Sequence, residues 1–134
     1  MREIESIKKI TVTTKFEGGP ETYSTSFQVF ISSITILPID EIVIRDVKWN
    51  ANPDGKCYLL WSNITNNFFR VLSASSTLPD SRSPIVIQTL PPDNVIEFRV
   101  FRARSIGEDR AHFNHSVQGE IDIDLEFISY KKNH

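Results

Sequence analysis

The most regular set of potentially reactive side chains in this sequence is a row of carboxylates near the C-terminus. Asp122, Asp124 and Glu126 alternate with apolar residues. Alternate residues of a β-strand share a face, so neighbouring carboxylates of the row would lie about 6–7 Å apart. A calcium site needs oxygen ligands from a second segment, and glycosidase carboxylates must face each other across a cleft. We therefore interpret the row as a solvated outer face of a sheet.

Arginines form a local basic stripe that could pair with this row or contact an acidic partner. They are Arg99, Arg102, Arg104 and Arg110. Because they are spread over both faces of a strand and into the next loop, we expect them to be salt-bridged or solvated. The formal net charge is −2, whereas nucleic-acid binders are usually basic. We therefore expect no nucleic-acid partner.

Histidine and cysteine give no recognisable catalytic or metal-binding pattern. His112 and His115 lie in a polar loop near Glu108 and Asp109, but this spacing is too loose to define a zinc site. The single cysteine, Cys57, begins an apolar stretch, which is typical of a buried and inert thiol. We expect no metal, no cofactor, no catalytic residues and no enzymatic activity.

Large aromatic side chains gather around the turn-rich segment 50–55 and the loop that follows it. Exposed rings could stack on sugars, whereas buried rings would pack in a core, which is the interpretation that we favour. Two of the rings are adjacent in the sequence, so a regular strand would place one of them outside. The candidate residues for an interface or a ligand contact are Trp49, Trp61, Phe68 and Phe69.

The elements that would position these residues are strands. β-branched and aromatic residues are frequent, and no run of eleven residues has the apolar spacing of a helix. The predicted strands are 7–16, 23–36 with a β-bulge at Ser32 and Ser33, 42–49, 57–62, 68–73, 84–90, 95–103 and 120–130. Long polar loops are predicted at 73–84 and 105–117.

The closing strand has the clearest pattern. Its inward residues are Ile121, Ile123, Leu125 and Phe127, and its outward residues are Glu120, Asp122, Asp124 and Glu126. A slip of one residue would bury four carboxylates, so the register of this strand should be strongly fixed.

These strands predict an all-β fold, namely an antiparallel two-sheet β-sandwich of about eight strands. Parallel pairing needs long, usually helical connections, and none is predicted. An immunoglobulin-like sandwich is disfavoured because one cysteine cannot supply the Cys–Trp–Cys arrangement, so we favour a jelly roll. The length of 134 residues and 40% hydrophobic content fit a single folded domain over 1–134.

Three segments carry a family resemblance: SITILPIDEIVI at 33–44, YLLWSNI at 58–64 and GEIDIDLEFISY at 119–130. In this order they resemble the small single-jelly-roll structural proteins of double-stranded DNA viruses and virophages. The resemblance implies a penton or minor capsid protein of the virion, made in the host cytoplasm. It also implies a homo-oligomer, a trimer or pentamer, that contacts other capsid subunits.

The sequence thus favours a non-enzymatic structural protein that acts through oligomeric packing. The alternative is a glycan-binding module or an attachment head built on a β-sandwich. No apolar stretch approaches the roughly 20 residues that span a bilayer, so no membrane partner is expected. The N-terminal residues include acids where a signal peptide would need a basic patch and an apolar run, which argues against secretion by a signal peptide.

Overall fold

The computed structural model describes residues 2–35, 38–51, 56–64, 67–75, 84–88, 93–105 and 107–132. These residues form eight strands and one short 3-10 helix, η1 (Ile31–Ser33). The strands are β1 (Ile4–Gly18), β2 (Tyr23–Phe30), β3 (Glu41–Ala51), β4 (Lys56–Ile64), β5 (Asn67–Ser75), β6 (Ile85–Ile87), β7 (Val95–Ala103) and β8 (Val117–Tyr130).

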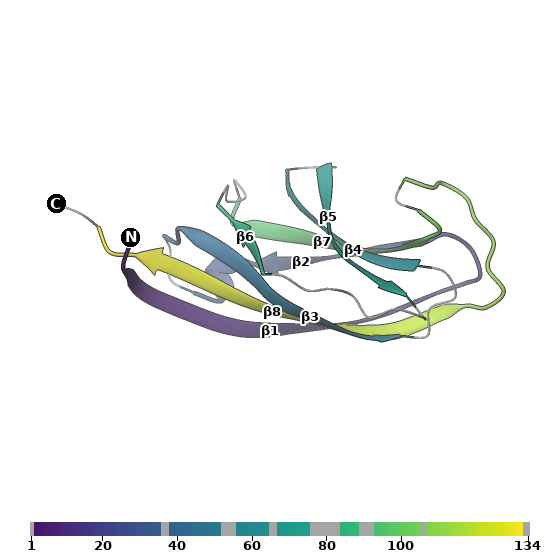
Figure 1. Ribbon diagram of the computed structural model, residues 1–134, viewed down its shortest axis with the longest axis horizontal. Coiled ribbons are helices and arrows are strands. Elements are labelled where there is room, and N and C mark those ends of the chain that lie inside the picture. Colours follow the sequence, from purple (N-terminus) through teal and green to yellow (C-terminus); the bar gives the residue numbers. More distant parts are fainter. Residues whose placement is uncertain are drawn as a thin grey trace.

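The strands build two four-stranded sheets that face each other (Figure 1). The strand order is β1-β8-β3-β6 in one sheet and β2-β7-β4-β5 in the other, and the paired strands are antiparallel. Consecutive strands alternate between the two sheets, except that β4 and β5 are neighbours in one sheet. This is the double Greek-key arrangement of a jelly roll, so the predicted fold class is confirmed.

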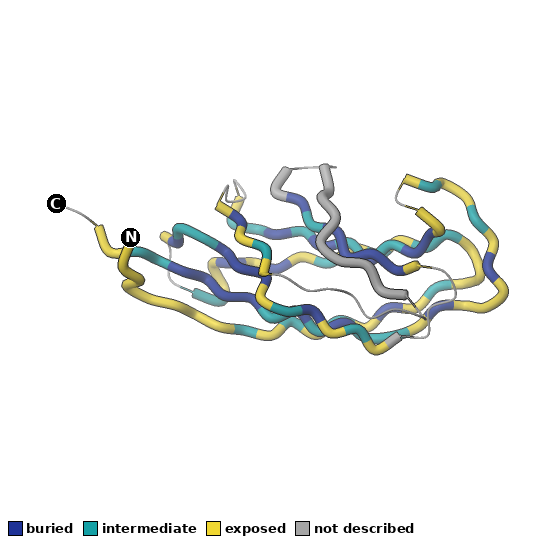
Figure 2. Tube along the Cα trace, viewed as in Figure 1, coloured by how far each residue is buried: buried dark blue, intermediate teal, exposed yellow. Residues whose placement is uncertain are grey.

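The hydrophobic core lies between the sheets and follows the two-residue period of the strands (Figure 2). In β8 the predicted inward residues are buried: Ile121, Ile123, Leu125 and Phe127. Ile96, Phe98 and Val100 of β7 face them from the other sheet and are fully buried. Because β8 lies between β1 and β3, its inward side chains occupy the middle of the first sheet.

The end of β2 differs from the prediction. A continuous strand with a bulge at Ser32 and Ser33 was expected, but the chain leaves the sheet after Phe30 through η1. The Ser33 hydroxyl donates to the Phe30 carbonyl at 2.7 Å, and the backbone N–H of Ile34 bonds the Ile31 carbonyl. Local bonds of this kind compete with a ladder, so the serines end the strand.

β6 is also shorter than the predicted strand 84–90. It pairs with β3 only from Ile42 to Ile44. The register of β3 against β8 shifts between Ile44 and Asp46. The irregularity of β3 therefore lies beside Ile85, at the start of β6, whereas the ladder ends after Ile87, which pairs with Ile42 near the start of β3.

Apolar side chains that remain exposed lie on the edges of the sheets. Among the described residues, the large hydrophobic side chains with high exposure are Ile4 (51%), Ile7 (43%), Phe30 (52%) and Val86 (52%). They belong to β1, β2 and β6, which are edge strands. Exposed apolar groups on edge strands are typical of contact surfaces. In the described part of the chain, no helix has the length and apolar character that crossing a membrane requires.

Candidate functional site

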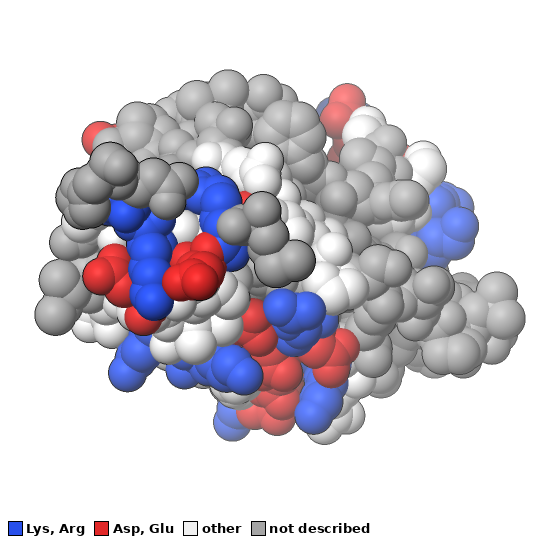
Figure 3. Space-filling view, turned by 60° about the vertical axis from the view of Figure 1, so that its left-hand side comes forward, with Lys and Arg blue, Asp and Glu red and all other residues white. Residues whose placement is uncertain are grey.

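The carboxylate row of β8 lies on the outer face of the first sheet and is bonded to both neighbouring strands. The hydroxyl of Thr13 donates to Asp122 Oδ1, and that of Thr11 donates to Asp124 Oδ1, each at 2.7 Å. Figure 3 shows acidic side chains in a band along the lower surface, with basic side chains at its borders. The row is therefore partly neutralised and hydrogen-bonded across the sheet.

Glu126 has the strongest partner of the row. The Arg45 guanidinium donates to it through Nε at 3.1 Å and through Nη2 at 2.8 Å. This fork-like contact holds the pKa of Glu126 below its ordinary value, and the positive charge of Lys9 acts in the same direction. Glu126 is consequently an ionised structural carboxylate rather than a general acid.

Two of the arginines that could have paired with this row lie in the other sheet. Arg99 and Arg102 belong to β7 in the opposite sheet, so their strand does not adjoin β8. The groups that reach the row come from β1 and β3. Among the described residues, no group of three or more histidine, cysteine or acidic side chains is arranged to hold a metal ion.

The two candidate tryptophans lie in different sheets and pack against the core. Trp49 is in β3 and meets the Phe16 ring edge to face, with 6.2 Å between the ring centroids. Trp61 is in β4 and is half-buried against the same core. This placement favours a packing role over a shared stacking platform for sugar rings.

The other two candidate aromatics lie in β5. The backbone of Phe68 pairs with Ser62, and that of Phe69 pairs with Trp61. Their side chains lie outside what the structure describes, so the expected exposure of one ring stays a prediction.

A buried arginine that the sequence did not single out fixes the long loop before β8. Arg102 is 0% exposed and follows Ile96, Phe98 and Val100 in the inward phase of β7. Its guanidinium donates to the carbonyls of His115 at 2.7 Å and Gly19 at 3.3 Å. The expectation of a solvated side chain was wrong for this residue. Its inward phase was the signal in the sequence.

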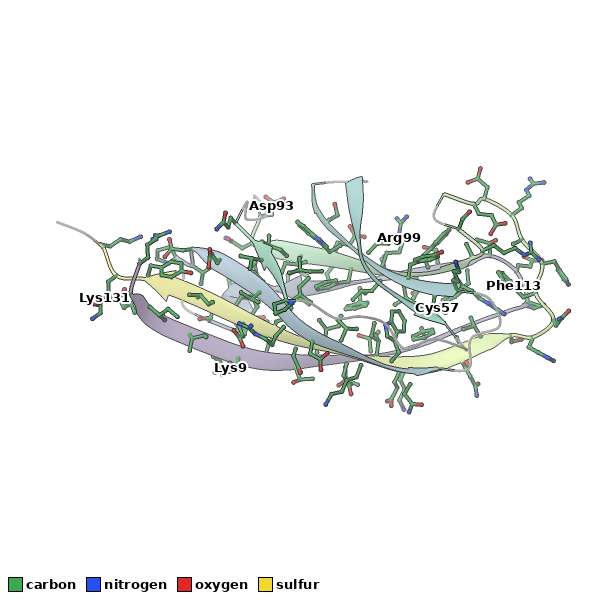
Figure 4. The ribbon with its side chains drawn as sticks, viewed as in Figure 1. Lys9, Cys57, Asp93, Arg99, Phe113 and Lys131 are labelled. Carbon is green, nitrogen blue, oxygen red and sulfur yellow. The ribbon has the colours of Figure 1, made fainter. Side chains whose placement is uncertain are left out.

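The loop that carries both histidines is organised by Arg102, Arg104 and Phe113. The Phe113 ring lies 4.0 Å from the guanidinium carbon of Arg102 and 5.3 Å from that of Arg104. Arg104 also donates to the His112 carbonyl at 2.7 Å. The labelled Phe113 and Arg99 in Figure 4 show that this loop lies at one end of the sandwich, beyond β7. Both histidines are exposed.

Cys57 of β4 is fully buried, as predicted (Figure 4). It lies opposite Arg102 in the β4–β7 ladder. Burial raises the pKa of its thiol from 9.0 to about 11, although the charge of Arg102 acts against this rise. The thiolate, which is the reactive form, is therefore scarce at neutral pH.

We expect Cys57 to resist alkylation in the folded protein. At pH 8 a thiol with a pKa near 11 holds about a hundredfold less thiolate than one with a pKa of 9, and burial slows access further. Iodoacetamide labelling followed by mass spectrometry should give little modification in buffer and rapid modification in urea. Equal rates in the two conditions would show that the thiol is accessible.

The chain ends are joined by a second polar cluster that the sequence did not reveal. Asp40 Oδ2 accepts the backbone N–H of Tyr130 at 2.7 Å, and this bond lowers the Asp40 pKa. The Tyr130 hydroxyl donates to Glu41, which lowers the Glu41 pKa. The Arg2 guanidinium lies 4.3 Å from the centroid of the Tyr130 ring. These contacts anchor both ends of the chain beside the start of β3.

An open hollow of about 700 Å³ lies where β1, β8 and β3 meet at the end away from this cluster. Its lining residues are Lys15, Phe16, Glu17, Asn50, Gln118, Gly119 and Glu120. The side chains supply carboxylates, amides and one ammonium group. Such a lining could hydrogen-bond a polar ligand, although the rings of Trp49 and Trp61 do not line it.

A scan of protein-family models, a search of curated proteins and a search of solved structures each find no match to this chain. The described strands define a jelly-roll β-sandwich that carries exposed apolar side chains on its edge strands β1, β2 and β6.

Proposed function

We propose that this protein is a non-enzymatic structural subunit that works by oligomeric packing, as in the shell of a virion. The observation that carries the proposal is the jelly-roll topology with exposed apolar side chains on its edge strands. Jelly rolls occur in viral capsid proteins and in lectins, among other classes. Since a fold alone does not determine function, the edge positions of Ile4, Ile7 and Phe30 supply the second part of the argument.

The polar contacts of the outer face support the same proposal. The outward residues of β8 are bonded to Thr11, Thr13 and Arg45, which ties this face to both neighbouring strands. Rows of charged side chains on a surface favour subunit contacts in a single orientation, because the charges of the two surfaces must be complementary. A capsid subunit of this type would form a closed trimer or pentamer and would then contact other shell proteins.

We expect the purified protein to form a homo-oligomer, a trimer or pentamer, at micromolar concentration. Closed symmetry would remove the exposed apolar side chains of the edge strands from water in every copy. Size-exclusion chromatography with light scattering measures the mass directly, and the subunit mass is 15.4 kDa. A monomer at high concentration would contradict self-assembly.

A second candidate function is glycan binding, and the polar hollow at the end of β1 is the observation that favours it. Sugar sites use carboxylates and amides to fix hydroxyl groups, as the lining of this hollow would allow. A glycan array on the isolated protein separates the two functions. The glycan-binding function would be preferred if the protein stays monomeric, binds a specific glycan and loses that binding in the Asn50→Ala variant.

A further inference from the structure

We propose that two copies of this protein pair antiparallel along the free edge of β1, around a two-fold axis at Thr13. The free edge of β1 thus pairs with β1 of a second copy of this chain. Such pairing would join the two β1-β8-β3-β6 sheets into one continuous sheet. This inference deepens the proposed structural function, because a two-fold contact is what links closed rings of subunits into a shell.

The edge of β1 is suited to accept another strand. β1 has 15 residues, and within the described part of the chain it pairs with β8 on one side only. Its ladder with β8 is regular from Ser6 to Gly18, after a register shift between Ile4 and Ser6. β1 contains no proline, so every backbone N–H of this regular stretch can take part in a ladder.

Lysines on an edge strand usually prevent strand pairing, so their register decides whether two copies can meet. Lys9, Lys15 and Glu17 are the charged and exposed residues on the outer face of the regular stretch. An axis at Lys9, at Val12 or at Lys15 would place lysine directly opposite lysine. Like charges at such positions are destabilising.

An axis at Thr13 removes this conflict. It places Lys9 of each copy opposite Glu17 of the other, so two attractive pairs form and no like charges meet. An axis at Ile10 would oppose Glu5 to Lys15, but Glu5 lies at the register shift that precedes the regular stretch. Of the axes centred on single residues from Lys9 to Lys15, only the one at Thr13 opposes opposite charges that both lie within the regular stretch. On the inner face the same register sets Ile10 opposite Phe16 of the second copy, which extends the apolar surface between the sheets. Lys9 already points away from the sandwich (Figure 4).

Single cysteine substitutions test the axis. Thr11 and Thr13 form a matched pair, because both are exposed on β1 and both donate to an aspartate of β8. In the proposed register, Thr13→Cys lies opposite itself, within the separation that a disulfide requires. Thr11→Cys lies about 14 Å along the strand from its counterpart. The buried Cys57 does not compete for either.

After mild oxidation, non-reducing electrophoresis should show several-fold more covalent dimer for Thr13→Cys than for Thr11→Cys. Equal dimer from both variants, or more from Thr11→Cys, would overturn the axis. No cross-linking in a protein that is still a trimer or pentamer by light scattering would refute the edge contact and leave the structural function standing. Cross-linked dimers without any larger closed oligomer would support the edge contact and contradict the proposed structural function.

A charge exchange gives a second readout. Glu17→Lys should weaken self-association about tenfold, because each copy then opposes lysine to lysine twice. Adding Lys9→Glu restores the opposite charges and should recover the affinity. Sedimentation equilibrium measures the self-association affinity of the single and the double variant. Failure of the double variant to recover, with each variant shown to be folded by circular dichroism, would contradict the pairing of these two residues.

Discussion

Arg102→Ala should lower the free energy of unfolding by about 4 kcal/mol, the largest effect that we expect from one substitution that adds no charge. The change removes two hydrogen bonds from a charged donor, which contribute about 1.5–3 kcal/mol each, and leaves an unfilled space. The carbonyls of His115 and Gly19 would lose their donor. Urea unfolding followed by tryptophan fluorescence measures the loss.

Arg104→Ala is the matched control for this experiment. Arg104 also lies near the Phe113 ring and also donates to a loop carbonyl, but its side chain is 61% exposed. Its removal should cost less than about 1 kcal/mol, as is usual for exposed contacts. A similar loss in the two variants would mean that burial of Arg102 is not what stabilises the loop.

Ile123→Asp should unfold the protein or cost at least several kcal/mol. Ile123 is fully buried in β8 between β1 and β3, so the new carboxylate would be desolvated without a partner. Circular dichroism in the far ultraviolet should show loss of the β spectrum or a large fall in the urea midpoint. A milder variant, Ile123→Val, should remain folded and cost about 1 kcal/mol.

Asp124→Ser, one residue further along, tests the other face of the same strand. Asp124 is half-buried and accepts one hydroxyl bond from Thr11, which a serine can partly replace. We expect a loss under about 1 kcal/mol. An equal loss of unfolding free energy in Asp124→Ser and Ile123→Asp would show that the outer face of β8 contributes as much to stability as its buried face.

The sequence was most informative where the side-chain period was long and unbroken. Ile121, Ile123 and Leu125 alternate with carboxylates, and one register alone keeps those carboxylates out of the core. The approximate ranges of most strands followed from such patterns together with the polar connections between them. The fold class, the face assignment of β8 and the burial of Cys57 could therefore be predicted from residues alone.

What escaped prediction depends on contacts between distant segments. Arg102 continues an apolar phase, but its acceptors in the loop before β8 and beside β1 are set by the folded topology. The partners of the carboxylate row could not be identified because a pattern within one strand does not say which strands flank it. The end of β2 was missed for a different reason: the Ser33 hydroxyl bonds the Phe30 carbonyl locally, and the alternating pattern does not show that this bond replaces the ladder.

The pairing of β1 with β8 has a consequence for how the chain folds as it is synthesised. Ile4 lies opposite Tyr130, so β1 cannot form its ladder until β8, which follows six other strands in the sequence, has been synthesised. β3 has the same dependence, because it lies on the other side of β8. Pairings that span nearly the whole sequence give a high contact order and slow folding. Until β8 has been synthesised, the edge of β1 that pairs with it stays unpaired, and transiently exposed strand edges of this kind favour aggregation.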